Sequence, residues 1–312
     1  MNRRPMGSTG MDVSEIGLGA WQLANPDWNL HDTGEALHIV AEALDLGCNF
    51  FDTAPGYGNG RSETLLGEAL KGVRDRVFIC TKFSGHTPEG ATNFDVKALR
   101  PTLENSLRRL QTDAVDILLM HNPPREMMDG NHSPHYEVME QLKEEGKLRA
   151  YGVSLDWREE LEMVVNTTGS QAVEVMFNVF YQEPLAAFKL AKERGVGLII
   201  KVPLDSGWLS GRYTEASQFD DIRRRWSSDV ISRRGRLVRE FAALVPPGTS
   251  LAHAALQYIL AQPEVSTVIP GPKTVAQVRD NFAAADNSLP AETVAAIYAM
   301  WKKELEADPL PW

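Results

Sequence analysis

The sequence predicts an α/β fold, a (β/α)8 TIM barrel, and three observations support this prediction. Short apolar and β-branched runs alternate with longer segments of helical periodicity along most of the chain. There are eight such runs, the number of strands that closes a parallel barrel. No segment rich in Pro, Gly and Ser divides the 312 residues, so we expect a single domain over residues 1–312.

Each expected strand is a short apolar run bounded by polar or turn-forming residues. These runs cover residues 16–19, 49–52, 77–81, 115–120, 150–153, 172–176, 197–202 and 267–269. Because helices separate them, neighbouring strands should be parallel and joined by right-handed crossovers.

The expected helices lie between these runs. They cover residues 34–46, 62–70, 95–110, 134–145, 157–165 and 184–194. In the first of them, Leu37, Val40, Ala41 and Leu44 have the i, i+3, i+4, i+7 spacing of a helix that packs on a sheet.

Three further segments are expected outside the regular alternation. Residues 3–15, with Gly7 and Gly10 between short extended pieces, predict a β-hairpin that plugs the bottom of the barrel. Long connections follow the fourth strand, at residues 122–133, and the seventh, at residues 204–228. Loops that follow barrel strands lie on the catalytic face, so we expect both to be functional.

The composition excludes some classes of function. A formal net charge of −10 argues against a general binder of nucleic acid or membrane surfaces. The N-terminus carries no apolar stretch typical of a signal peptide, and no run approaches the roughly 18 apolar residues of a membrane span, so we expect a cytoplasmic protein. A local arginine cluster is either a solvated helix face or lies near an anionic cofactor; it comprises Arg223, Arg224, Arg225, Arg233, Arg234, Arg236 and Arg239.

Four ionisable side chains follow consecutive strands and should meet at one mouth of the barrel. Asp52 ends the second strand and Tyr57 lies in the next turn, while Lys82 and His121 end the third and fourth strands. Alone, each would be an ordinary turn, packing or surface residue. Together they predict a catalytic site.

These residues, with GLGAW at 17–21, FDTAPGYGNGRSETLLGEAL at 51–70 and VIPGPKTVAQVRDN at 268–281, resemble the aldo-keto reductase superfamily. The resemblance extends over about residues 4–285. It implies an oxidoreductase that uses NADPH/NADP+ to interconvert an aldehyde or ketone, sugars included, with the corresponding alcohol. Its partner would be this small carbonyl or alcohol; the oligomeric state stays open.

The residue types suit that chemistry. Carbonyl reduction needs a proton at oxygen, and Tyr57, a weak acid with an ordinary pKa near 10, would supply it. We expect Lys82 to lower the pKa of Tyr57 and Asp52 to keep Lys82 charged. His121 would donate a hydrogen bond to the same oxygen. The predicted substrate-binding residues are Trp21, Tyr57, His121 and Asn122.

The resemblance also implies where the cofactor lies. Ser154 would bind the carboxamide and Lys273, at the start of a helix, the 2′-phosphate that distinguishes NADPH from NADH. The complete implied set is Gly19, Ala20, Trp21, Asp52, Ser154, Glu174, Lys201, Leu204, Ser206, Gly207, Gly271, Lys273, Gln277 and Asn281.

Three positions depart from the family pattern. Leu155 replaces an Asn, Glu174 replaces the Gln that binds the carboxamide, and Lys201 replaces the aromatic residue that stacks on the nicotinamide. We expect Glu174 to offset the charge of Lys201. An ammonium beside the ring would favour NADPH over NADP+.

Other functions remain open at this stage. Lys82 or Lys201 could form a Schiff base in an aldolase or isomerase. Potassium-channel β subunits share the fold and the four residues, so a regulatory protein is a third candidate. No metal is expected: His132 and His135 fit loop polarity at the pocket rim better than metal ligation. Trp28, Met127, Met128 and Trp208 could line an apolar substrate pocket.

Overall fold

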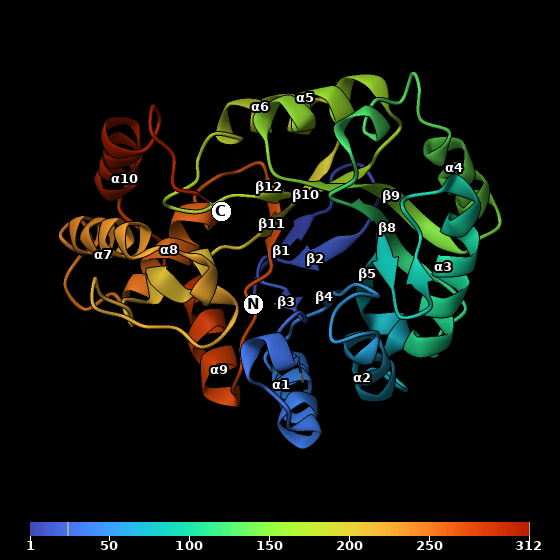
Figure 1. Ribbon diagram of the computed structural model, residues 1–312, viewed down its shortest axis with the longest axis horizontal. Helices are drawn as coiled ribbons and strands as arrows, with labels where there is room; N and C mark the ends of the chain where they lie inside the picture. The colour runs from blue at the N-terminus through green and yellow to red at the C-terminus, as the bar shows by residue number, and fades with distance from the viewer. Residues whose placement is uncertain (24, 312) are drawn as a thin grey trace.

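The computed structural model describes residues 1–23 and 25–311, and its centre is a parallel eight-stranded sheet curled into a barrel. A ring of helices surrounds the strands (Figure 1). The strands, in spatial order, are β3 (Leu18–Gly19), β4 (Phe50–Asp52), β5 (Phe78–Phe83), β8 (Val115–His121), β9 (Leu148–Leu155), β10 (Ala172–Met176), β11 (Gly197–Lys201) and β12 (Val265–Val268). The predicted barrel fold is confirmed, and spatial order follows chain order.

The barrel closes between its first and last strands through backbone contacts. Ile16 and Val268 form a parallel bridge, and the amide of Gly17 donates to the carbonyl of Val268 at 2.8 Å. Gly19 approaches so closely that a Cβ there would lie 2.7 Å from the carbonyl oxygen of Ile269. The closure therefore needs a residue without a side chain at position 19.

Of the α-helices in the described part of the chain, eight form the ring and two lie outside it. The ring consists of α1 (Thr33–Asp45), α2 (Arg61–Ala69), α3 (Val96–Leu110), α4 (His135–Glu144), α5 (Arg158–Thr167), α6 (Leu185–Glu193), α8 (Leu251–Leu260) and α9 (Val275–Ala283) among the described residues. Helices α7 (Ser228–Ala242) and α10 (Ala291–Glu304) lie at its periphery (Figure 1). The strand–helix pattern did not predict α7, α8 or α10.

Alternation along the strands separates two hydrophobic clusters. The inward cluster includes Phe50, Cys80, Ile117, Leu119 and Ala172, and Met6, Met11 and Val13 from the N-terminal segment complete it. That segment is an antiparallel hairpin of β1 (Arg3–Pro5) and β2 (Asp12–Ser14). The predicted plug at the bottom of the barrel is confirmed.

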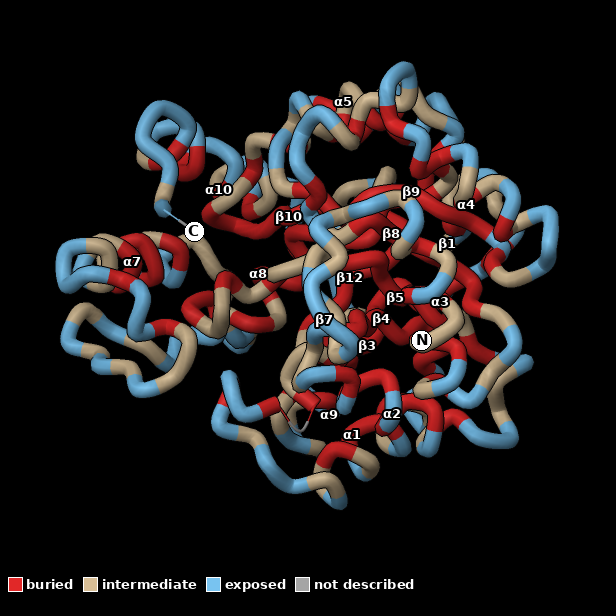
Figure 2. Tube along the Cα trace, turned by 45° about the vertical axis from the view of Figure 1, so that its right-hand side comes forward, coloured by how far each residue is buried: buried red, intermediate tan, exposed pale blue. Residues whose placement is uncertain are grey.

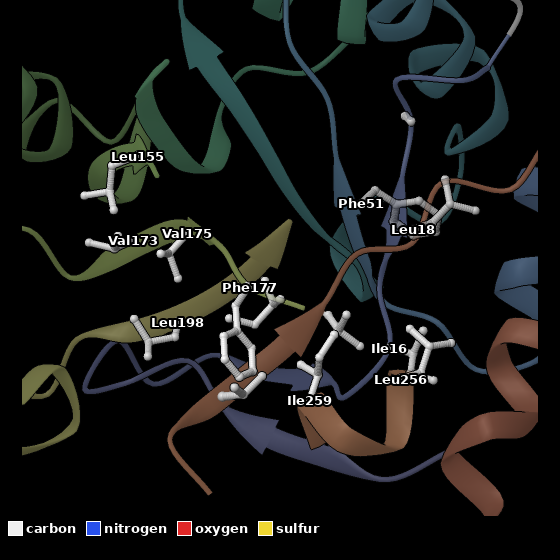
Figure 3. Packing of buried hydrophobic residues seen from close by; sticks show 14 of the residues in the cluster. Ile16, Leu18, Phe51, Leu155, Val173, Val175, Phe177, Leu198, Leu256 and Ile259 are labelled. Carbon is white, nitrogen blue, oxygen red and sulfur yellow. The ribbon is translucent and has the colours of Figure 1, made fainter. Parts of the chain in front are cut away.

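The outward cluster lies between the strands and the helices. Leu18, Phe51, Val173 and Leu198 belong to it, together with residues of α8 (Figure 3). Burial is concentrated at the strands and on the inner faces of the helices, whereas the outer helix faces and loops are exposed (Figure 2). This rigid core positions the ends of the strands.

Three extended connections lie at the carboxyl ends of the strands. The predicted loops after β8 and β11 are present and contain the short helices η3 (Arg125–Met127), η4 (Asp205–Ser210) and η5 (Ile222–Arg225). A third, after β5, contains the small hairpin of β6 (His86–Thr87) and β7 (Gly90–Ala91), which we did not predict. Within the described residues, none of the helices has the length and apolar content that a bilayer crossing requires.

Candidate active site

The strand alternation that builds the inner core also positions the polar site. Phe50, Cys80, Leu119 and Ala172 face the inside of the barrel. Two positions after each of them, respectively, lie Asp52, Lys82, His121 and Glu174. Side chains two residues apart point to the same face of a strand. The apolar interior therefore ends in a polar layer at the carboxyl ends of β4, β5, β8 and β10.

This layer forms the floor of a cavity of about 810 Å³. The predicted site residues that line it are Gly19, Trp21, Asp52, Tyr57, His121, Asn122, Glu174, Lys201, Leu204, Ser206, Gly207, Gly271, Lys273, Gln277 and Asn281. Three others do not reach its surface: Ala20, Lys82 and Ser154 are completely buried. Lys82 and Ser154 act on the cavity only through the residues they contact.

Lys82 is the centre of the buried charges. Its Nζ lies 2.7 and 2.6 Å from the two carboxylate oxygens of Asp52 and 3.2 Å from Oε2 of Glu174. It lies 5.2 Å from the ring centroid of Tyr57. Burial alone would lower the pKa of Lys82, but the two carboxylates outweigh it and the pKa is raised. Lys82 therefore carries a fixed positive charge.

Glu174 and Asp52 respond to this environment in opposite directions. Burial raises the pKa of Glu174, but Lys82 and Lys201 outweigh that effect and bring it to about 2. Burial, reinforced by the Glu174 carboxylate, raises the pKa of Asp52.

Ligand atoms of Asp52, Glu174 and Cys80 lie within 4.8 Å of one another, as in a metal site. The Lys82 ammonium already bonds Asp52 and pairs with Glu174 there.

Glu174 and Lys201, which we expected to offset each other's charge, interact electrostatically but form no direct ion pair. Lys201 Nζ lies 3.0 Å from Oδ1 of Asp156, 2.8 Å from Oδ1 of Asn122 and 2.9 Å from Oγ of Ser154. Only the Ser154 hydroxyl, 2.8 Å from Oε1 of Glu174, connects the two residues. The strand register explains this, because Lys201 is level with Met176, two residues beyond Glu174.

Lys82 acts on Tyr57 in the expected direction, but the pKa of Tyr57 is raised overall. Burial raises the pKa of the phenol, and the Lys82 ammonium offsets this only in part because Asp52 and Glu174 act against it. Tyr57 is therefore protonated at neutral pH. A protonated phenol suits proton donation.

His121 is held as a neutral imidazole beside Tyr57. Burial and the Lys82 charge lower its pKa to about 3. Its Nδ1 lies 3.1 Å from Oγ of Ser84, and its ring meets the Tyr57 ring edge-on with centroids 5.8 Å apart. Sequence analysis missed Ser84, although it lies two residues beyond Lys82 and the strand alternation could have identified it.

An aromatic wall adjoins the end of the cavity at which Tyr57 and His121 lie. Trp21 stacks on Tyr57 with centroids 5.9 Å apart and contacts Trp28 edge-on at 5.1 Å. Polar lining residues that sequence analysis missed include Gln22, His86 and Asp156. The wall thus combines indole surface with hydrogen-bonding groups.

Several expected pocket residues lie elsewhere. Trp208 is completely buried in an aromatic cluster, and Met128 is in the hydrophobic core. His132 is exposed beside Asp129, whereas buried His135 lies in hydrogen-bonding distance of Ser133 and of the Phe94 carbonyl. Neither histidine, nor Met127, lines the cavity.

The other end of the cavity is cationic. Arg212, Arg223, Arg225 and Lys273 line it. Burial and the Arg223 charge lower the pKa of Lys273, whose Nζ donates to the carbonyl of Trp28 at 2.8 Å. An anionic group would relieve this crowding of positive charge, so the residues present fit the phosphates of a nicotinamide dinucleotide.

The arginine cluster is thus divided between two roles. Arg223 and Arg225 line the cavity, whereas the arginines of α7 pair with residues outside it. On α9, Arg279 points outward and pairs with Glu42 of α1. Of the cations near the end of the chain, Lys273 is the one that reaches the cavity.

A strained turn follows β11 and borders the same cationic end. Asp205 and Ser206 both have positive φ, 48° and 53°, and Gly207 follows with φ 95°. Non-glycine residues adopt this conformation only where their surroundings hold it. Here buried Arg234 contacts the Asp205 carboxylate, and Arg223 donates to the Ser206 carbonyl at 3.3 Å.

Comparisons with known proteins agree with this geometry. The model of the Aldo/keto reductase family matches residues 15–302. The chain is 28% identical to the uncharacterized oxidoreductase YqkF of Bacillus subtilis, over 98% of both chains. It is 32% identical to L-galactose dehydrogenase of Arabidopsis thaliana, over 90% of this chain and 87% of that one. The holo form of aldo-keto reductase AKR11C1 from Bacillus halodurans superposes with a TM-score of 0.82 at 28% identity, over 96% of both chains.

Proposed function

The chain belongs to the aldo/keto reductase family, and on this premise we propose that it is an NADPH-dependent carbonyl reductase with Tyr57 as proton donor. Membership makes it an oxidoreductase that acts on carbonyl groups. One observation carries the finer proposal: a protonated Tyr57 lines the cavity beside a fixed Lys82 ammonium and a neutral His121.

The proton transfer follows from this arrangement. A carbonyl oxygen bound between Tyr57 and His121 receives two hydrogen bonds, which stabilise the negative charge that develops during reduction. Tyr57 then gives its proton to that oxygen, and the Lys82 ammonium stabilises the phenolate that remains. Asp52 fixes the position of Lys82 through both carboxylate oxygens.

The bound cofactor supplies the hydride that adds to the carbonyl carbon. Lys273 would hold the adenosine 2′-phosphate, with Gln277 and Asn281 near the adenine. The turn at residues 204–207 would hold the pyrophosphate. Glu174 and Lys201, both hydrogen-bonded to the buried Ser154, would lie beside the carboxamide, and Gly19 and Trp21 would border the ring. A 2′-phosphate partner favours NADPH over NADH.

The substrate end supports a small hydroxylated carbonyl compound, such as a sugar. An indole face beside hydrogen-bonding groups such as Gln22 and His86 suits a molecule with apolar and hydroxyl-bearing faces. One relative of this chain is named for L-galactose, which accords with this class. A Schiff-base mechanism is disfavoured, because Lys82 is a paired ammonium and a Schiff base needs the free amine.

The experiment is an NADPH-oxidation screen over aldehydes, ketones and aldoses, with Tyr57→Phe and Lys273→Met beside the wild type. We expect Tyr57→Phe to lose at least about a hundredfold in kcat while its Kd for NADPH stays nearly unchanged. Lys273→Met should weaken NADPH binding and leave NADH binding nearly unchanged. A Tyr57→Phe enzyme with most of its activity would contradict the proposal.

A further inference from the structure

The Lys82 ammonium is shared among three groups that compete for it. Two oxygens of Asp52 and one of Glu174 lie within 3.2 Å of Nζ, while the Tyr57 ring centroid is 5.2 Å away. Asp52 on β4 and Glu174 on β10 approach Lys82 from different strands of the barrel. A second carboxylate is therefore placed where it opposes negative charge on the phenol oxygen.

The surroundings keep Glu174 ionised and fixed. It is almost completely buried, and its Oε1 accepts a hydrogen bond of 2.8 Å from the Ser154 hydroxyl on β9. The charged or titratable groups that face it from the packed elements are Asp52 on β4, Tyr57 in the turn after β4, Cys80 and Lys82 on β5, His121 on β8 and Lys201 on β11. Only the two lysines are cationic, and Asp156 pairs with Lys201.

We propose that Glu174 is a positioning residue that acts on Tyr57 through Lys82 and keeps Tyr57 in the protonated form that carbonyl reduction needs, at the expense of the phenolate that alcohol oxidation needs. This inference rests on the proposed function. In reduction, the O–H bond of Tyr57 breaks, its proton joins the carbonyl oxygen as hydride from the reduced cofactor joins carbon, and Tyr57 regains a proton from water. Oxidation needs the opposite starting state, a Tyr57 phenolate.

The electrostatics of the site support this direction. Glu174 raises the pKa of Tyr57, in the same sense as Asp52 and against Lys82. A neutral side chain of the same shape at position 174 would remove one of the two carboxyl groups that flank Lys82 and leave Asp52, whose pKa Glu174 now raises, as the other. The ammonium would then stabilise the phenolate more strongly, and the phenolate would form at lower pH.

The test is the pH dependence of both reaction directions in Glu174→Gln. We expect the rise of alcohol oxidation with pH, and the alkaline fall of carbonyl reduction, to move to lower pH by about one unit or more. The ratio of kcat for alcohol oxidation to kcat for carbonyl reduction at neutral pH should increase about tenfold. Glu174→Asp, which keeps the charge, should retain most of the wild-type profile.

Two controls separate this role from a structural one. Asp116→Asn removes another buried carboxylate, which pairs with Arg74 and Arg149 away from the cavity, and should leave the profile unchanged. If Glu174→Gln does not fold, Glu174→Gln/Lys201→Met removes one charge of each sign and should show the same shift. Melting temperatures and the Kd for NADPH are measured for every variant.

The outcomes are distinct. A folded, active Glu174→Gln with a wild-type pH profile overturns the inference, as does a change confined to the Kd for NADPH. Those results leave the proposed reductase function intact, because the wild type still consumes NADPH with a carbonyl. A wild type inactive on every carbonyl overturns both.

Discussion

Ser84 Oγ lies 3.1 Å from Nδ1 of His121, and both residues line the cavity. Because the imidazole is neutral, only one of its nitrogens carries a hydrogen. A serine hydroxyl that donates to Nδ1 leaves the hydrogen on Nε2. That tautomer presents an N–H to a carbonyl oxygen bound beside Tyr57.

Ser84→Ala should therefore weaken catalysis without weakening binding. Without the hydroxyl, Nδ1 can carry the hydrogen and Nε2 becomes an acceptor that repels the carbonyl oxygen. We expect kcat to fall about tenfold or more while the Kd for NADPH is unchanged. Ser84→Thr keeps a hydroxyl and should restore the rate; nitrogen NMR of the labelled imidazole reports the tautomer. An Ala variant with wild-type kcat would remove Ser84 from the mechanism.

The rate of carbonyl reduction should be nearly independent of pH from about 5 to 10. The pKa of His121 is lowered to about 3, so the imidazole stays neutral throughout this range. The pKa of Tyr57 is raised, so the proton-donating form is present at all lower pH and is lost only when the pH rises through that value. A pH–rate profile checks this. A break between pH 6 and 8 would show that one of these groups titrates near neutrality.

The sequence was sufficient to predict the barrel because strand and helix periods alternate clearly. Helix α8 lacks that contrast: seven of its ten residues are buried, so it has almost no polar face. The hairpin of β6 and β7 has only two residues in each strand, too few for a period to be recognised. Arg234 lies in an arginine-rich segment that is typical of an exposed helix face. Its burial depends on its ion pair with Asp205, which is distant in sequence.

The site was less predictable where partners come from different strands. That Asp52 and Lys82 would be close follows from the pairing of β4 with β5. The contact of Lys82 with Glu174 joins β5 to β10, which are not neighbours in the sheet, and arises only because the barrel closes. The pairing of Lys201 with Asp156 depends on the register of β11 and on the loop after β9, which the sequence does not specify.

Lys201 and Asp156 should shift the preference between the two oxidation states of the cofactor in opposite directions. If the nicotinamide lies against Lys201, its ammonium disfavours the cationic oxidised ring, and Asp156, 3.0 Å away, offsets part of that charge. We expect Lys201→Met to lower the ratio of the Kd for NADP+ to the Kd for NADPH about threefold to tenfold, and Asp156→Asn to raise it. Fluorescence titrations measure both constants. Equal ratios in all three proteins would place the ring away from Lys201.

Arg234 should be a large single contributor to stability and to the shape of the cofactor end. Its guanidinium is 1% exposed, contacts the buried Asp205 carboxylate, donates to the Pro311 carbonyl at 2.8 Å and lies 4.3 Å from the Trp226 ring centroid. Arg234→Met leaves Asp205 as an uncompensated buried charge, which typically costs about 3–5 kcal/mol of unfolding free energy. Because Asp205 begins the strained turn, NADPH binding should weaken too.

Two further variants decide whether the charge or the packing of Arg234 matters. Arg239→Met, on the same helix α7, removes an exposed pair with Glu215 and should cost less than about 1 kcal/mol. Arg234→Met/Asp205→Asn removes both buried charges, and Asn tolerates the positive φ at position 205. Chemical denaturation should therefore show the double variant to be more stable than Arg234→Met alone. If it is equally unstable, the loss comes from the packing of Arg234 against Trp226 and the segment at Pro311, and the ion pair with Asp205 contributes little.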